Sequence, residues 1–193
     1  MSVITFTLLW AAVGFYAAAL LVSAFKAGGR EANASARPLV ACGVAANAAM
    51  FVVMFAAKRF PSDYEVMNSL SKGFFLAAIL LFTMKRLESR MPAAVSLGVV
   101  LYFILSRMYF AKSLEFQSSM AFAYSYLSVI FSYMSNLAFA CFGFCFSLSA
   151  TYLADPEKGS PGGAKQSGMI FKSALSGFVV YSFCQILGSA WAL

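Results

Sequence analysis

The sequence contains no histidine. Histidine is the commonest metal ligand and the commonest general base near neutral pH, so most metal and acid–base sites lose their usual residue here. The four cysteines form no CxxC pair and lie within apolar runs, where cysteine behaves as a small buried hydrophobic residue. We therefore predict a protein that is not an enzyme, with no catalytic residues and no metal site.

Charged residues are also scarce, at 11% of the chain, whereas hydrophobic residues make up 62%. A soluble domain has about 25% and about 45–50%, respectively, so the excess apolar surface must face lipid. This excludes a soluble enzyme, a secreted disulfide scaffold and a disordered chain. The net charge of +7 does not indicate nucleic-acid binding, because the cations stand at the ends of apolar runs and form no basic face.

The apolar runs predict an all-α, polytopic transmembrane helix bundle with about six spans, in a single integral membrane domain covering residues 1–193. The predicted spans are 4–25, 38–57, 66–84, 91–108, 126–152 and 173–193. Residues 116–154 carry no charge and would form a helix of about 58 Å. We read them as one long element, with residues 116–125 at the interface. Gly, Pro and Ser make 155–168 a predicted flexible cytoplasmic loop.

Basic residues predict the orientation, because Lys and Arg are enriched in cytoplasmic loops. Nine of them flank the first, third and fifth connections, and five flank the other side of the membrane. We therefore predict that both termini face outward.

A polar stripe marks the fifth apolar segment. Ser128, Ser132 and Ser135 follow steps of four and three residues, so they share one face of a helix. Small polar residues let membrane helices approach closely, which is one interpretation of the stripe. The other is a groove for a cofactor, formed by Tyr124, Ser125, Ser128, Ser132 and Tyr133.

Three stretches within residues 60–193 carry a family resemblance. The first is FPSDYEVMNSL at 60–70. The second runs from FQS at 116–118 through SY at 132–133 to YL at 152–153. The third is 171–193, with GF at 177–178 and GSAWA at 188–192. In this order and spacing they resemble the cytochrome c assembly proteins, the family that includes CcsA, ResC and CcmC.

The resemblance implies a protein of the bacterial inner membrane that binds haem and presents it to apocytochrome c outside. It adds Trp191, at the outer end of the last span, to the residues that would contact haem. In the family, a tryptophan-rich loop of the WGxxWxWD kind follows this span, and the sequence ends before such a loop. The family's histidine at the start of the long helix is replaced by Tyr124 or Ser125.

Without histidine, this chain cannot ligate haem iron as the family does. The resemblance therefore implies a scaffold for haem that acts with a partner chain carrying the tryptophan-rich loop, and that serves apocytochrome c indirectly. Haem is expected only with that partner. The alternative is a structural membrane subunit of a respiratory or electron-transfer complex, with no cofactor of its own.

Overall fold

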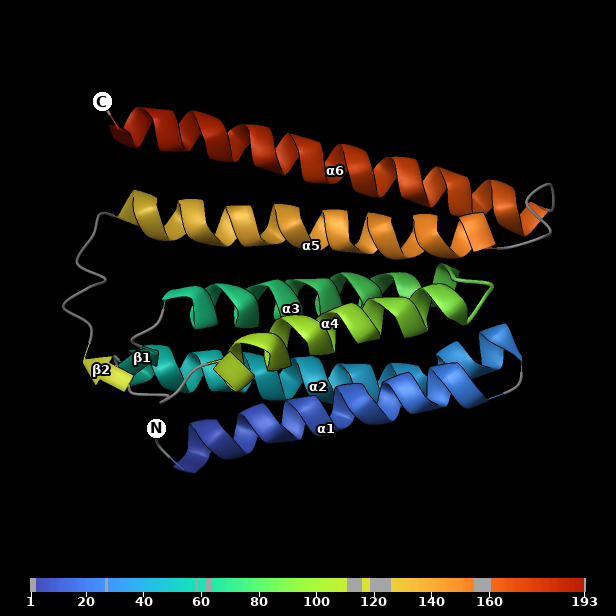
Figure 1. The fold of residues 1–193 in the computed structure, drawn as a ribbon, viewed down its shortest axis with the longest axis horizontal. Helices are drawn as coiled ribbons and strands as arrows, with labels where there is room; N and C mark the ends of the chain where they lie inside the picture. The colour runs from blue at the N-terminus through green and yellow to red at the C-terminus, as the bar shows by residue number, and fades with distance from the viewer. Residues whose placement is uncertain are drawn as a thin grey trace.

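The computed structural model describes residues 3–26, 28–57, 59–61, 64–110, 116–118, 126–154 and 161–192. Six helices in this part of the chain run back and forth along one axis (Figure 1). They are α1 (Val3–Phe25), α2 (Gly29–Ala56), α3 (Tyr64–Thr83), α4 (Met91–Phe110), α5 (Tyr126–Ala154) and α6 (Pro161–Ala192). A short 3-10 turn, η1 (Met84–Arg86), follows α3.

The predicted all-α membrane bundle is confirmed. Among the described residues, α1, α2, α3, α5 and α6 are long and apolar enough to cross a membrane. Helix α4 is 20 residues long and lies beside α3 (Figure 1). Both chain termini lie at one end of the bundle, as an even number of alternating helices requires (Figure 1). The side of the membrane that this end faces stays a prediction.

The helix that contains the second span begins earlier than predicted. We placed the start of the span at Pro38, but α2 begins at Gly29 and includes that proline. Residues 29–37 are rich in strong helix formers such as Ala, Arg and Glu. Tertiary contacts also hold this segment, because Asn33 Nδ2 donates to the carbonyl oxygens of Leu87 and Ser89 at 3.1 and 3.0 Å. These two effects outweigh the backbone hydrogen bond that proline removes.

The predicted loop 155–168 is wrong from residue 161 onward, since α6 starts at Pro161. Proline suits the first position of a helix, where its missing N–H costs no hydrogen bond. Gln166 Nε2 then donates to the Leu148 carbonyl oxygen and to Thr151 Oγ1, both at 2.9 Å, which anchors the start of α6 on α5. Residues 155–160 lie outside the described part of the chain.

Two strands of three residues were not predicted. β1 (Arg59–Pro61) and β2 (Phe116–Ser118) pair antiparallel, with Phe60 opposite Gln117. They join the α2–α3 connection to the α4–α5 connection, at the end of the bundle where the termini lie (Figure 1). Helices α3 and α5 both begin at this end and pack on each other, so they run parallel although α4 separates them in the chain.

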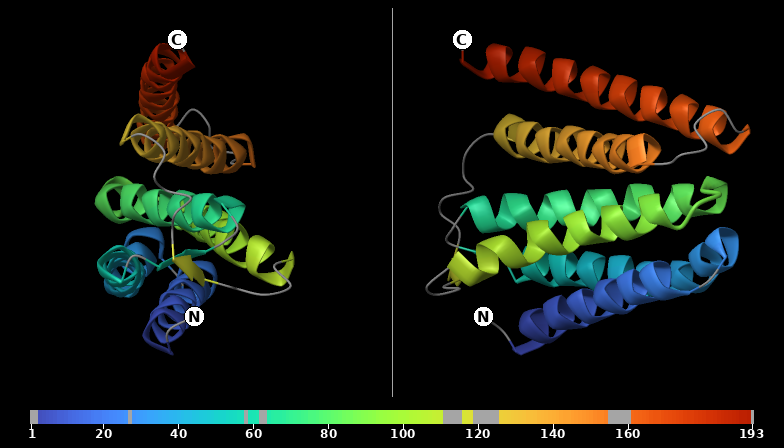
Figure 2. Two further views of the ribbon diagram at one scale, coloured as in Figure 1. Left: turned by 90° about the vertical axis from the view of Figure 1, so that its left-hand side faces the viewer. Right: turned by 45° about the vertical axis from the view of Figure 1, so that its right-hand side comes forward.

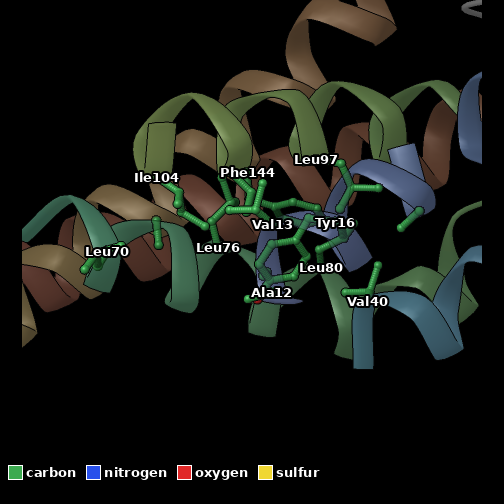
Figure 3. Packing of buried hydrophobic residues seen from close by; sticks show 14 of the residues in the cluster. Ala12, Val13, Tyr16, Val40, Leu70, Leu76, Leu80, Leu97, Ile104 and Phe144 are labelled. Carbon is green, nitrogen blue, oxygen red and sulfur yellow. The ribbon is translucent and has the colours of Figure 1, made fainter. Parts of the chain in front are cut away.

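The buried core lies among α1 to α4 and one face of α5. Tyr16, Leu80 and Leu97 come together there from three different helices, and Phe144 reaches in from α5 (Figure 3). The fully buried cluster contains no described residue of α6. That helix packs on α5 at the edge of the bundle, as both views in Figure 2 show. Much of the apolar surface of α6 is therefore left for lipid or for another protein.

Electrostatic contacts tie α6 to the other helices at the end away from the termini. Glu88, in the connection between α3 and α4, accepts from Lys165 Nζ at 2.7 Å and from Arg30 Nη2 at 3.4 Å. The pKa of the Glu88 carboxyl lies below its ordinary value of 4.5. The Lys165 ammonium is the larger cause and the Arg30 guanidinium the smaller one. Glu88 thus links α2 to α6.

Candidate functional site

A polar contact joins α3 to α5 near the end of the bundle where the termini lie. The side-chain oxygen of Asn68 accepts hydrogen bonds from Ser132 Oγ at 2.9 Å and from Asn136 Nδ2 at 3.1 Å. Ser132 and Asn136 are one helical turn apart on α5, so both reach the same acceptor on α3. In a membrane such interhelical hydrogen bonds fix which faces of two helices meet.

Five aromatic side chains from three helices form a continuous chain of ring contacts beside this polar pair. Phe51 on α2 contacts Phe74 on α3, with ring centroids 5.6 Å apart. Phe74 contacts Phe75 at 5.6 Å, and Phe75 meets Tyr133 on α5 edge-on at 6.4 Å. Tyr133 in turn lies 6.4 Å from Phe55, which is back on α2. Edge-on and tilted contacts of this kind are the favoured geometries for aromatic pairs.

These five rings, together with Ala48, Val52 and Ser71, line a half-open cavity of about 300 Å³. Ligand cavities range from about 300 to 1,000 Å³, so this one accepts a small group or one edge of a large molecule. The accessible wall is apolar. The Ser71 hydroxyl is occupied, because it donates to the Met67 carbonyl oxygen at 2.9 Å. The cavity therefore suits a flat or branched hydrocarbon group and has no site for a charged one.

The fit of these residues to haem is partial. The aromatic wall matches the apolar edge of a planar macrocycle, but the cavity is too small to enclose the whole group. The lining offers no histidine, cysteine or methionine side chain for the iron. Within the described residues there is also no group of three or more histidine, cysteine or acidic side chains that could hold a metal ion. Of the side-chain types that ligate haem iron, the lining contains only the phenol of Tyr133.

The structure brings only some of the predicted site residues together. Ser132 and Tyr133 are brought together against α2 and α3, where they take part in the polar contact and the aromatic chain. Ser128 lies in the first turn of α5, and Trp191 lies in the last turn of α6. Tyr124 and Ser125 lie outside the described residues.

Asn68, Asn136 and the phenylalanine rings were missed from the sequence. Asn136 stands four residues after Ser132, so the helical period that selected the serines could also have found it. No comparable signal existed for Phe51 or Phe75, because their importance depends on α2, α3 and α5 being neighbours.

Lys72 adds a cation to the same pair of helices. Its ammonium lies 4.7 Å from the ring centroid of Phe139 on α5, which is a cation–π distance. Lys72 follows Asn68 by one turn and Phe139 follows Asn136 by three residues. The polar contact between α3 and α5 therefore continues as a cation–π contact.

Described residues of the three stretches that carry the family resemblance contact one another. Asn68 from the first contacts Ser132 from the second. Cys184 from the third donates through Sγ to the Phe131 carbonyl oxygen at 3.2 Å. Comparison of the chain with known protein families, with curated proteins and with solved structures finds no match.

Proposed function

We propose that this chain is a membrane component of cytochrome c biogenesis, which serves as a scaffold for haem handling and delivery together with a partner chain. The aromatic cavity between α2, α3 and α5 is the observation that carries the proposal. Tyr133 in its wall and the neighbouring Ser132 belong to the stretch that resembles the family's long helix. The resemblance also supports a location in the bacterial inner membrane.

Each part of the site has a separate task in this proposal. The rings of Phe75 and Tyr133 bind the apolar edge of the macrocycle by stacking and dispersion. The hydrogen bonds from Ser132 and Asn136 to Asn68 position these rings by holding α5 against α3. The partner chain supplies the axial ligands of the iron, because this sequence contains no histidine. Apocytochrome c then receives haem from the assembly and not from this chain alone.

Purification of the tagged chain in a mild detergent tests the proposal, with its partners identified by mass spectrometry. We expect a partner that carries a tryptophan-rich outer loop and histidines, and haem recovered with the complex. The chain expressed alone should show no sharp haem spectrum. A tight haem spectrum from the isolated chain, or a complex without such a partner, would contradict the proposal.

Matched variants test whether the cavity takes part. Phe75→Ala removes one ring from the cavity wall, and we expect less haem to be recovered with the complex and less holocytochrome c to form. Phe82→Ala is the control, because Phe82 lies on the same helix but is 80% exposed. Equal haem recovery from both variants, with the complex intact, would remove the cavity from the proposed mechanism.

The second candidate is a structural subunit of a respiratory or electron-transfer complex. It is favoured by α6, which leaves large apolar side chains such as Phe171, Phe178 and Ile186 exposed at the edge of the bundle. Co-purification with respiratory subunits, and without haem or a haem-ligating partner, would select this function.

A further inference from the structure

We propose that the end of the bundle away from the termini binds the phosphate of an anionic phospholipid, at a site built around Arg37 on α2. This inference is independent of the proposed function and concerns a different part of the molecule. It rests on the way the basic residues at this end divide into those with a protein partner and those without one.

The described residues at this end include eight cations and only two carboxylates, Glu31 and Glu88. Four of the cations have a protein partner. Arg30 and Lys165 bind Glu88, Lys26 Nζ donates to Ser35 Oγ, and Arg90 donates to the Lys26 carbonyl oxygen. The single carboxylate that forms ion pairs here is thus already shared by two cations. It cannot neutralise the others.

The remaining cations are Arg37, Lys85, Arg86 and Lys172, for which the described part of the chain provides no ion pair or hydrogen bond. Lys85 and Arg86 are exposed in η1, which contacts α2. Arg37 stands four residues after Asn33, whose side chain binds the Leu87 and Ser89 carbonyls directly after η1. Residues four apart share a helix face, so Arg37 lies on the side of α2 that faces η1.

Arg37 differs from an ordinary surface arginine. Its side chain is half-buried, and its Nε–H is enclosed by protein without a hydrogen-bond partner. A partly desolvated guanidinium without an anion is unfavourable, and an anion that reaches its open end relieves the cost. A guanidinium also binds two phosphate oxygens at once, which a lysine cannot do.

The position of Arg37 along the chain identifies the anion as a lipid headgroup. It is the last charged residue before the apolar run of α2, which continues without a charge from Pro38 to Ala57. Arg37 therefore stands where the hydrocarbon core meets the headgroups. Basic clusters between helices at this level bind anionic headgroups, and each cation near the surface contributes about 1 kcal/mol.

Native mass spectrometry of the full chain in detergent micelles tests the proposal. The probes are phosphatidylglycerol and phosphatidylcholine with identical acyl chains. We expect phosphatidylglycerol to bind more tightly, and Arg37→Gln to weaken its binding about fivefold, the factor for one surface cation. Arg37→Lys keeps the charge and should restore part of the affinity. Circular dichroism of each variant shows whether the helices remain folded.

Arg30→Gln is the matched control, because it removes the same charge from the same helix end but from an arginine that already has Glu88 as partner. We expect it to weaken phosphatidylglycerol binding less than Arg37→Gln does, because the Arg30 charge is already paired with Glu88. Equal losses in both variants, or no preference for phosphatidylglycerol, would overturn the site. Displacement of the lipid by inorganic phosphate, but not by chloride at the same ionic strength, would assign the site to a soluble phosphate instead.

Discussion

Replacement of Gly43 by alanine probes the closest approach between α1 and α2. A Cβ atom at this position would lie 2.5 Å from Cε1 and 2.7 Å from Cδ1 of Tyr16. The Tyr16 ring is fully buried and surrounded by core residues, so it has no free space into which to move. The two helices must therefore separate, or the ring must leave its rotamer.

Two effects of opposite sign determine the size of the change. Overpacking a buried contact costs about 1–3 kcal/mol. Alanine in a helix gains about 0.8–1.0 kcal/mol over glycine through its higher helix propensity. We therefore expect Gly43→Ala to lower the free energy of unfolding by about 0–2 kcal/mol. Gly14→Ala isolates the propensity gain, because a Cβ atom at Gly14 meets nothing within 4 Å.

The assay is unfolding in mixed micelles of increasing SDS content, followed by circular dichroism. The difference between the Gly43 and Gly14 variants measures the overpacking cost, which should be about 1–3 kcal/mol. Tyr16→Leu in the Gly43→Ala background should recover part of the loss, since it removes the ring atoms that clash. If Gly43→Ala is as stable as Gly14→Ala, the packing of Tyr16 on Gly43 is not as described.

Further predictions concern the α3–α5 contact and the link to α6. Asn68→Ala should lower the free energy of unfolding by about 1–2 kcal/mol because it leaves two donors unpaired, whereas Ser132→Ala removes one donor and should cost less. Equal losses in the same SDS assay would contradict the shared acceptor. Glu88→Gln should speed amide hydrogen exchange in the first turns of α6 at neutral pH, as measured by mass spectrometry. Because the folded pKa of Glu88 is lowered, the wild-type link is fully present above its ordinary value of 4.5 and is lost only as the pH falls through the lower pKa of the folded protein. The wild type and the variant should then exchange alike, and a difference that persists at low pH would refute the ionic link.

The predicted spans and the observed helices agree where the sequence is continuously apolar. Inside a bilayer each backbone polar group needs a partner within its own segment, so a long apolar run specifies a helix without knowledge of its neighbours. The predictions fail at Pro38 and at residues 161–168, where proline and glycine indicate a break. There, a partner elsewhere in the chain decides the outcome, such as Leu148 and Thr151 for Gln166.

Some residues of the candidate site could be predicted from the local sequence, and others depend on which helices become neighbours. Ser132 and Tyr133 could be selected because helical spacing and side-chain chemistry are local properties. Asn68 and Phe75 could not, because α3 and α5 become neighbours only after α4 has returned to the end where β1 pairs with β2. The order of helices in the bundle also decides that Arg30 shares Glu88 with Lys165, whereas Arg37 has no such partner within the described residues.

The sequence by itself therefore determined that this is a helical membrane protein, the approximate limits of its spans and the absence of histidine ligands. These properties depend on composition and on the length of apolar runs. Only the tertiary structure decided which polar groups meet, where an aromatic cavity forms and which cations remain available to an external anion. Each of these depends on contacts between segments far apart in the chain, since lipid solvates every apolar helix face alike and does not specify which faces pair.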